Sequence, residues 1–207
     1  MRLASSLLLV SLAVPATAHA QAATDTLSLA GRNVIALGIG LTGARDATAS
    51  GGSASTHTTG QVASIAFTHF ERRQLAIEIS AAVLDADTKA SPGYAYNSAV
   101  LPVLFGLSYS PRELALTTSV RPFVSAAVGP YFHSVNIASA TGVTSSTTES
   151  AAGARFGAGV NWYVARHFML QLEGDYHAVG SFEHPDALTQ KPSGFGLSFG
   201  FGFMWGR

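Results

Sequence analysis

The stretch 194–205 alternates strictly between two kinds of residue. Its odd positions are bulky and apolar: Phe195, Leu197, Phe199, Phe201, Phe203 and Trp205. Its even positions are small or flexible: Gly194, Gly196, Ser198, Gly200, Gly202 and Met204. A period of two is that of a β-strand with two different faces. The bulky face cannot be left in water, and a lipid bilayer would cover it. The stretch therefore predicts a strand in the wall of a membrane barrel.

Seven earlier stretches alternate in a similar way, at about 33–41, 61–70, 74–83, 98–109, 119–133, 151–164 and 167–177. Long polar segments (42–60, 85–97, 134–150 and 178–193) and short turns (71–73, 110–118 and 165–166) connect them in alternation. Outer-membrane barrels have short periplasmic turns and longer extracellular loops. The pattern predicts an all-β, eight-stranded antiparallel up-and-down transmembrane β-barrel, with both termini in the periplasm.

Composition helps to decide which face of the strands points outward. A soluble lipocalin-like barrel would place the bulky side chains inside and expose the other face to water. That other face is mostly Gly, Ala and Ser, and only 12% of all residues are charged, against roughly 25% in soluble domains. Eight strands enclose an interior just wide enough for side chains to fill, so small residues fit the inside. We therefore expect the bulky face to contact lipid.

The N-terminus is typical of a secretory signal. Arg2 precedes the apolar segment 7–14, and Ala18-His19-Ala20 matches a signal cleavage site. An uncleaved membrane anchor is the alternative, but the apolar segment is shorter than the ~20 residues that span a bilayer. We predict a signal peptide at 1–20, a leader at 21–32 and a barrel domain at 33–205. The zero formal net charge gives no indication of nucleic-acid binding.

Four charged residues fall on faces that the alternation assigns to the barrel interior: Glu78, Arg155, Glu173 and Asp175. A lone charge inside a narrow barrel is costly, so the charges should pair. We expect Arg155 to pair with Glu173 or Glu78 in a network that fills the lumen. A gate or a proton path is the functional alternative.

Asp175, His177 and Ser181 lie close together in sequence near the extracellular rim. Some small barrels are lipid A-modifying hydrolases with a His/Ser/acid site at that level. The spacing here does not match that of the deacylases, so ordinary rim polar residues are the favoured interpretation. His57, His133 and His184, in or beside loops, show no metal-ligand spacing. The Gly-x-Gly pairs precede no helix and are not nucleotide loops. The sequence thus assigns no catalytic, cofactor-binding or metal residues and predicts no enzyme.

Aromatic residues gather at the predicted strand ends. The short-turn ends carry Phe70, Tyr109, Trp162, Tyr163, Phe168 and Trp205, and the opposite ends carry Tyr131, Phe132, Tyr176 and Phe195. Aromatic rings favour the membrane–water interface. These residues therefore predict two aromatic girdles.

Several segments resemble the outer-membrane protein β-barrel domain family, the OmpA/OmpX-like small eight-stranded barrels. They are 121–129 (RPFVSAAVG), 157–162 (GAGVNW), 168–176 and the last strand. The resemblance implies location in the cell outer membrane, among its lipids and lipopolysaccharide, and insertion by the barrel-assembly machinery. Members commonly end on an aromatic residue read by that machinery; here Gly206 and Arg207 follow Trp205.

The sequence favours a structural or surface-exposed protein that presents its polar extracellular loops, and not a large pore. A lipid A-modifying hydrolase, and a narrow pore or small-ligand carrier, are the alternatives. No cofactor is implied, and the oligomeric state is left open.

Overall fold

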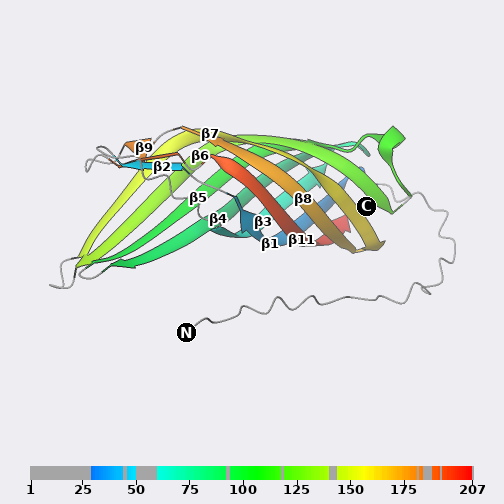
Figure 1. Cartoon of the computed structure of the whole chain (residues 1–207). Helices are drawn as coiled ribbons and strands as arrows, with labels where there is room; N and C mark the ends of the chain where they lie inside the picture. Colours follow the sequence, from blue (N-terminus) through cyan, green and yellow to red (C-terminus); the bar gives the residue numbers. More distant parts are fainter. Residues whose placement is uncertain are drawn as a thin grey trace.

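A computed structural model describes residues 29–43, 46–49, 60–91, 94–117, 119–139, 144–180, 182–183, 188–191 and 193–206. Eight antiparallel strands form a closed barrel (Figure 1). They are β1 (Arg32–Thr42), β3 (Gly60–Phe70), β4 (Leu75–Ser91), β5 (Tyr94–Tyr109), β6 (Val120–Ser139), β7 (Thr144–Ala165), β8 (Phe168–Val179) and β11 (Gly194–Gly206). Strands adjacent in the chain are neighbours in the wall, and β1 pairs with β11 from Arg32↔Gly206 to Thr42↔Gly196. The predicted all-β, eight-stranded up-and-down barrel is confirmed.

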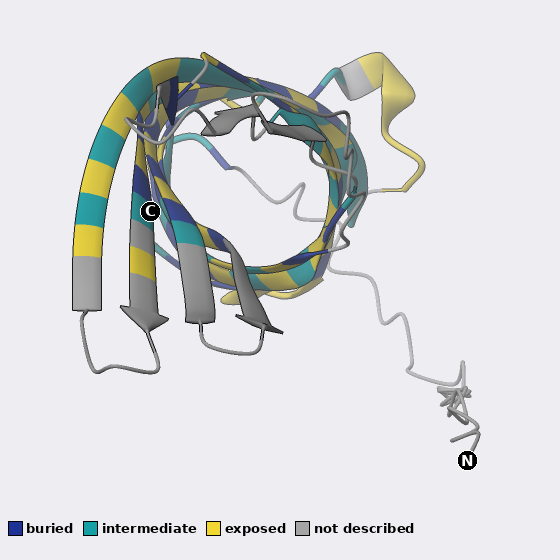
Figure 2. Cartoon of the chain, turned by 60° about the vertical axis from the view of Figure 1, so that its left-hand side comes forward, coloured by how far each residue is buried: buried dark blue, intermediate teal, exposed yellow. Residues whose placement is uncertain are grey.

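The alternation of the sequence becomes an alternation of exposure. Along β11, Phe199 and Phe201 are 49% and 46% exposed, whereas Gly200, Gly202 and Met204 are buried. The same banding runs along the other strands (Figure 2). The large apolar side chains thus point away from the barrel, as expected for a wall that faces lipid. The less regular strands follow the rule too, since Val124 and Val128 are exposed while Ser125 is buried.

Small residues on the inner face let the strands curve around a narrow interior. A Cβ atom added at Gly129 would meet the backbone oxygen of Val103, and one added at Gly159 would meet that of Leu172. Because backbone cannot give way as a flexible side chain can, these two positions require glycine. A Cβ at Gly157 would collide with Glu173 and Ser125, so this glycine makes room for the polar groups of the lumen.

Two of the predicted long loops are largely strand, and those predictions were wrong. The segment 85–97 continues β4 to Ser91 and begins β5 at Tyr94, and the segment 134–150 continues β6 to Ser139 and begins β7 at Thr144. Their Ser, Thr and Ala composition is typical of loops, but cross-strand pairing continues almost to the tips, with Ser91↔Tyr94 in one hairpin and Ala138↔Thr144 in the other. Hydrogen bonding to a neighbour thus outweighed local composition.

The result is a four-stranded sheet of β4, β5, β6 and β7 that projects beyond the barrel, which we call the extension (lower left in Figure 1). Among the described residues, β3 pairs with β4 only as far as Val62↔Leu84, and β8 pairs with β7 only from Val179↔Gly153. The outer strands of the extension, 85–91 and 144–152, therefore form its two edges.

The other two predicted loops contain short strands. β2 (Asp46–Ala49), β9 (Phe182–Glu183) and β10 (Leu188–Lys191) form a second, three-stranded sheet in the order β2-β10-β9. β8 also runs to Val179, slightly into the predicted loop 178–193. The small sheet lies at the same end of the barrel as the extension (Figure 1).

The opposite end, which we call the short-turn end, carries compact connections. They are 71–74, 110–119 with the single 3₁₀ turn η1 (Arg112–Leu114), and 166–167. Backbone hydrogen bonds from Arg72 to Leu75 and from Ser110 to Gln74 tie the first two to the wall. Among the described residues, no helix is long and apolar enough to cross a membrane.

Candidate functional site

The lumen holds an ion pair that joins distant strands. Arg155 on β7 donates a hydrogen bond from Nη2 to Oε1 of Glu78 on β4 at 2.5 Å. The side chains of Arg155 and Glu78 are only 12% and 11% exposed, respectively. Two strands, β5 and β6, separate them in the wall, so the pair bridges the interior. The prediction that Arg155 would pair with Glu173 or Glu78 is confirmed for Glu78.

Glu173 and Asp175 on β8 find other partners. Ser125 on β6 donates from its hydroxyl to Oε1 of Glu173 at 3.0 Å, and Glu173 is 7% exposed. His177 Nε2 lies 3.4 Å from Oδ1 of Asp175. The alternation of β8 places Glu173, Asp175 and His177 on one face, so the three side chains follow one another along the lumen.

Tyr131 completes the polar group from the neighbouring side. Its hydroxyl lies 2.8 Å from Nδ1 of His177, and the two rings meet edge to face with centroids 5.8 Å apart. His177 therefore contacts Tyr131 through Nδ1 and lies close to Asp175 through Nε2. Tyr131 is fully buried. The three side chains form a linked polar group, in which Oδ1 of Asp175 has no hydrogen-bond partner among the described residues.

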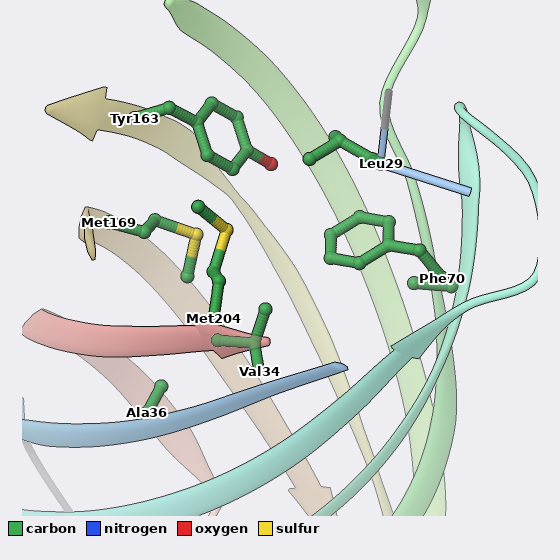
Figure 3. Close-up of a cluster of buried hydrophobic side chains, with 8 residues drawn as sticks. Leu29, Val34, Ala36, Phe70, Tyr163, Met169 and Met204 are labelled. Carbon is green, nitrogen blue, oxygen red and sulfur yellow. The ribbon is translucent and has the colours of Figure 1, made fainter. Parts of the chain in front are cut away.

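An apolar cluster closes the lumen at the short-turn end. Leu29, just before β1, is fully buried against inner-face side chains of several strands (Figure 3). The other members are Val34, Ala36, Phe70, Ala76, Tyr163, Met169 and Met204. A hydrogen bond from Gly31 N to the oxygen of Phe70 and a positive φ of 76° at Gly31 let the chain turn into the opening.

A second apolar cluster lies toward the extension. It comprises Leu84, Val100, Leu104, Ala127, Tyr131, Val179 and Phe182. Phe182 belongs to β9, so the small sheet contributes a side chain to the interior. The centroids of the Phe182 and His133 rings are 5.0 Å apart. Phe182 is 2% exposed. The interior is therefore polar at its centre and apolar toward each end.

A cavity of about 60 Å³ remains among the polar groups, lined in part by Glu78, Arg155, Glu173, Asp175 and His177. That volume has room for a few ordered water molecules. Three carboxyl groups and one guanidinium thus line the chamber. It can hold water and orient it through these polar groups.

Some residue placements predicted from the sequence were wrong. Phe70, Tyr131 and Tyr163 were expected in the aromatic girdles, but all are buried inside the barrel. His133, expected in or beside a loop, lies within β6 and is also buried. In the alternation of their strands, all four residues fall on the side of the inward-facing residues, so the alternation predicts that they are buried. The aromatic character of the first three suggested the membrane interface instead.

The remaining girdle residues do lie on the outer face. Tyr109, Trp162 and Phe168 are 43%, 46% and 40% exposed near the short-turn end. Phe195 and Tyr176 contact each other on the outside toward the other end, with tilted rings whose centroids are 4.8 Å apart. Trp205 packs against Phe203 and Phe67 on the same surface. Their outward placement is confirmed, and their position at the membrane interface stays a prediction.

Of the predicted hydrolase group, Asp175 and His177 meet inside the lumen, while Ser181 lies outside the described residues, as do His57 and His184. Within the described part of the chain, no group of three or more acidic or histidine side chains could hold a metal ion. The buried Asp175–His177 pair faces the lumen and not the lipid.

Comparison with known proteins supports the geometry. Residues 5–203 match the outer membrane protein beta-barrel domain family. A search of curated protein sequences finds no match.

Among similar solved structures is Ail, the attachment invasion locus protein of Yersinia pestis, in complex with the heparin analogue sucrose octasulfate, at 14% identity and a TM-score of 0.54 over 85% of this chain and 99% of that one. Neisserial surface protein A is 15% identical, with a TM-score of 0.54 over 86% of this chain and 98% of that one. The outer membrane protease OmpT from Escherichia coli is 8% identical, with a TM-score of 0.51 over 86% of this chain and 97% of that one. At these identities the likeness concerns the fold.

Proposed function

Since the chain belongs to the outer membrane protein β-barrel domain family, we propose that it is a non-enzymatic surface protein of the outer membrane. In this proposal residues 1–20 direct export and are removed, and the barrel anchors the chain in the membrane. The extension then projects outside the cell as a platform for contact with other molecules. The single observation that carries the proposal is the length of β4–β7, since β7 has 22 residues where about 9–11 suffice to cross a bilayer.

The edges of the extension supply the chemistry of contact. Strand edges carry unpaired N–H and C=O groups that can pair with an extended segment of another chain. Segments 85–91 and 144–152 are polar, with Thr88, Thr147 and Thr148 among them, which suits a surface that faces water. The partner class that fits is a protein with an extended, edge-pairing segment.

A polyanion fits less well. The predicted outward connections contain six acidic residues against three basic ones, the latter being Arg45, Lys89 and Lys191. Electrostatic repulsion would oppose a sulfated sugar of the kind seen with Ail. The resemblance to Ail therefore supports display at the surface and not the same ligand.

The closed lumen supports the exclusion of a large pore. Apolar clusters lie on both sides of the polar chamber, and the Arg155–Glu78 pair spans it. We expect no stable open channel in planar bilayers. We also propose no catalytic step, because both ring nitrogens of the buried His177 contact Tyr131 and Asp175. Mass spectrometry of lipid A incubated with the refolded protein would detect any hydrolysis that contradicts this.

Site-directed labelling tests the display directly. The chain contains no cysteine, so single substitutions give unique sites. Cysteines at Thr88 and Ser146, on the two edges, should react with a membrane-impermeant maleimide in intact cells. A matched cysteine at Arg73, in a short turn, should react only after the cells are opened. Labelling of position 73 alone in intact cells would reverse the orientation and overturn the proposal.

A further inference from the structure

The short-turn end of the barrel is rich in arginine. Each of its three turns carries at least one, and the strand that begins there carries another: Arg72 and Arg73, Arg112, Arg166, and Arg32. Glu71 and Glu113 are the acidic residues of the same turns. The outward connections have the opposite balance, with six acidic residues to three basic ones. The chain thus has no formal net charge, but positive charge predominates at the short-turn end and negative charge at the opposite end.

Three of these arginines are exposed at the rim: Arg72, Arg73 and Arg166. Arg32 is different, because it is buried and donates from Nη1 to the backbone oxygen of Arg166 at 2.7 Å. Arg121, at the start of β6, lies over the ring of Tyr163, 5.8 Å from its centroid. Arg32 and Arg121 therefore support the rim, and among the side chains that the structure describes, Arg72, Arg73 and Arg166 carry its exposed positive charge.

The exposed arginines lie just beyond the outward-facing apolar residues of the wall at the short-turn end. Trp162 and Val164 are outward-facing residues of β7, 46% and 44% exposed, and Arg166 follows two residues later. A strand advances roughly 3.3 Å per residue, and each headgroup layer is roughly 5–8 Å thick. Phe67, an outward-facing residue of β3 that is 40% exposed, lies five residues before Arg72. With the ring of Trp162 at the membrane interface, the guanidinium of Arg166 would lie level with the phosphates.

The turn 110–119 adds an apolar element at the same level. Leu114 and Leu116 are 59% and 71% exposed. Figure 2 shows this turn standing outside the ring of strands. Exposed leucines beside basic residues are typical of surfaces that lie at a membrane interface. Insertion into the acyl boundary would remove this apolar surface from water.

We propose that the short-turn end is a binding surface for anionic phospholipids of the periplasmic leaflet. Arg72, Arg73 and Arg166 bind the phosphate groups, since a guanidinium matches phosphate oxygens in a bidentate geometry. Leu114 and Leu116 insert below them. The net charge of the lipid decides the preference, because a basic cluster at an anionic leaflet gains affinity with each added positive charge. The assignment of this leaflet to the periplasm rests on the proposed orientation.

Electron spin resonance tests this on the full chain refolded in phosphatidylcholine vesicles. Spin-labelled phosphatidylglycerol and phosphatidylcholine are added in turn, and the relative association of each with the barrel is measured. We expect phosphatidylglycerol to be favoured about twofold or more at low salt, with the preference reduced in 1 M salt by screening. The variant R72Q/R73Q/R166Q should bring the ratio close to one.

Two further variants make the result specific. The control K89Q/K191Q removes two positive charges near the extension and should keep the preference of the parent chain. The variant L114Q/L116Q should weaken the association of both lipids while leaving their ratio unchanged. Heat-modifiable migration on gels verifies that each variant is folded.

The proposal is overturned if the parent chain shows no preference, if the triple variant keeps it, or if the control loses it equally. The measurement does not depend on which end faces the cell exterior. A failed lipid preference and a reversed orientation in the cysteine labelling are therefore separate outcomes.

Discussion

The outer and inner faces of the same wall are specified in different ways. On the outer face, Leu197, Phe199 and Phe201 need only be large and apolar, because any of them can contact lipid. On the inner face several polar side chains each depend on a partner far along the chain: Arg155 on Glu78, Ser125 on Glu173, and Tyr131 on His177, with separations of 77, 48 and 46 residues. The comparison teaches that one face is fixed by pattern and the other by particular contacts.

The largest expected effect comes from breaking the inner face at its ion pair. Arg155→Ala would leave Glu78 buried without its guanidinium, which typically costs about 3–5 kcal/mol. Urea titration of the barrel refolded in phosphatidylcholine vesicles would measure the loss in the free energy of unfolding. The double variant R155M/E78Q, which removes both charges, should recover much of that loss. A midpoint for Arg155→Ala equal to that of the parent chain would contradict the pairing.

A charge placed on the outer face should have the next largest effect, and one that depends on depth. Phe199→Arg lies near the middle of β11 and should cost about 2–4 kcal/mol in bilayers, whereas Trp205→Arg lies near the rim and should cost about 0–1 kcal/mol. The same vesicle titrations supply both values. Equal costs at the two positions, unchanged when lipid is replaced by a soluble environment, would indicate that Phe199 is core.

Two leucines sharpen the contrast at a smaller scale. Leu29→Ala removes a fully buried side chain from the apolar cluster at the short-turn end and should cost about 2 kcal/mol, the lower end of the range for such truncations. Leu114→Ala, at an exposed site, should change stability by less than about 0.5 kcal/mol. Both are read from urea midpoints. If both variants unfold at the same urea concentration, Leu29 does not close the barrel.

Strand number and the facing of each strand could be predicted from the sequence because both follow from local periodicity. β5 follows the rule as well, with Val100 and Leu104 buried on the inner face and Leu101 and Val103 exposed on the outer face. The placements of Phe70, Tyr131 and Tyr163 were wrong where residue type was weighed above parity. A ring can satisfy its apolar surface equally well in a lumen cluster or in lipid, so its type does not decide its face.

The length of β4–β7 could not be predicted in the same way. Segments 85–97 and 134–150 have no strong alternation, and their strand form depends on hydrogen bonds to each other, such as Tyr94↔Ser139. The choice between Glu78 and Glu173 as partner of Arg155 was also open, because it depends on how strands meet across the lumen. Contacts through space of this kind are not encoded in the period of one strand.

The central claim is that the bulky face of the wall contacts lipid and the small-residue face does not. Cysteine variants at Ser198 and Phe199, each labelled with a fluorophore in the refolded barrel, test it at two adjacent residues of β11. Lipids carrying nitroxide quenchers along their acyl chains should quench the label at 199 strongly and the label at 198 weakly. Equal quenching, or stronger quenching at 198, would contradict the account.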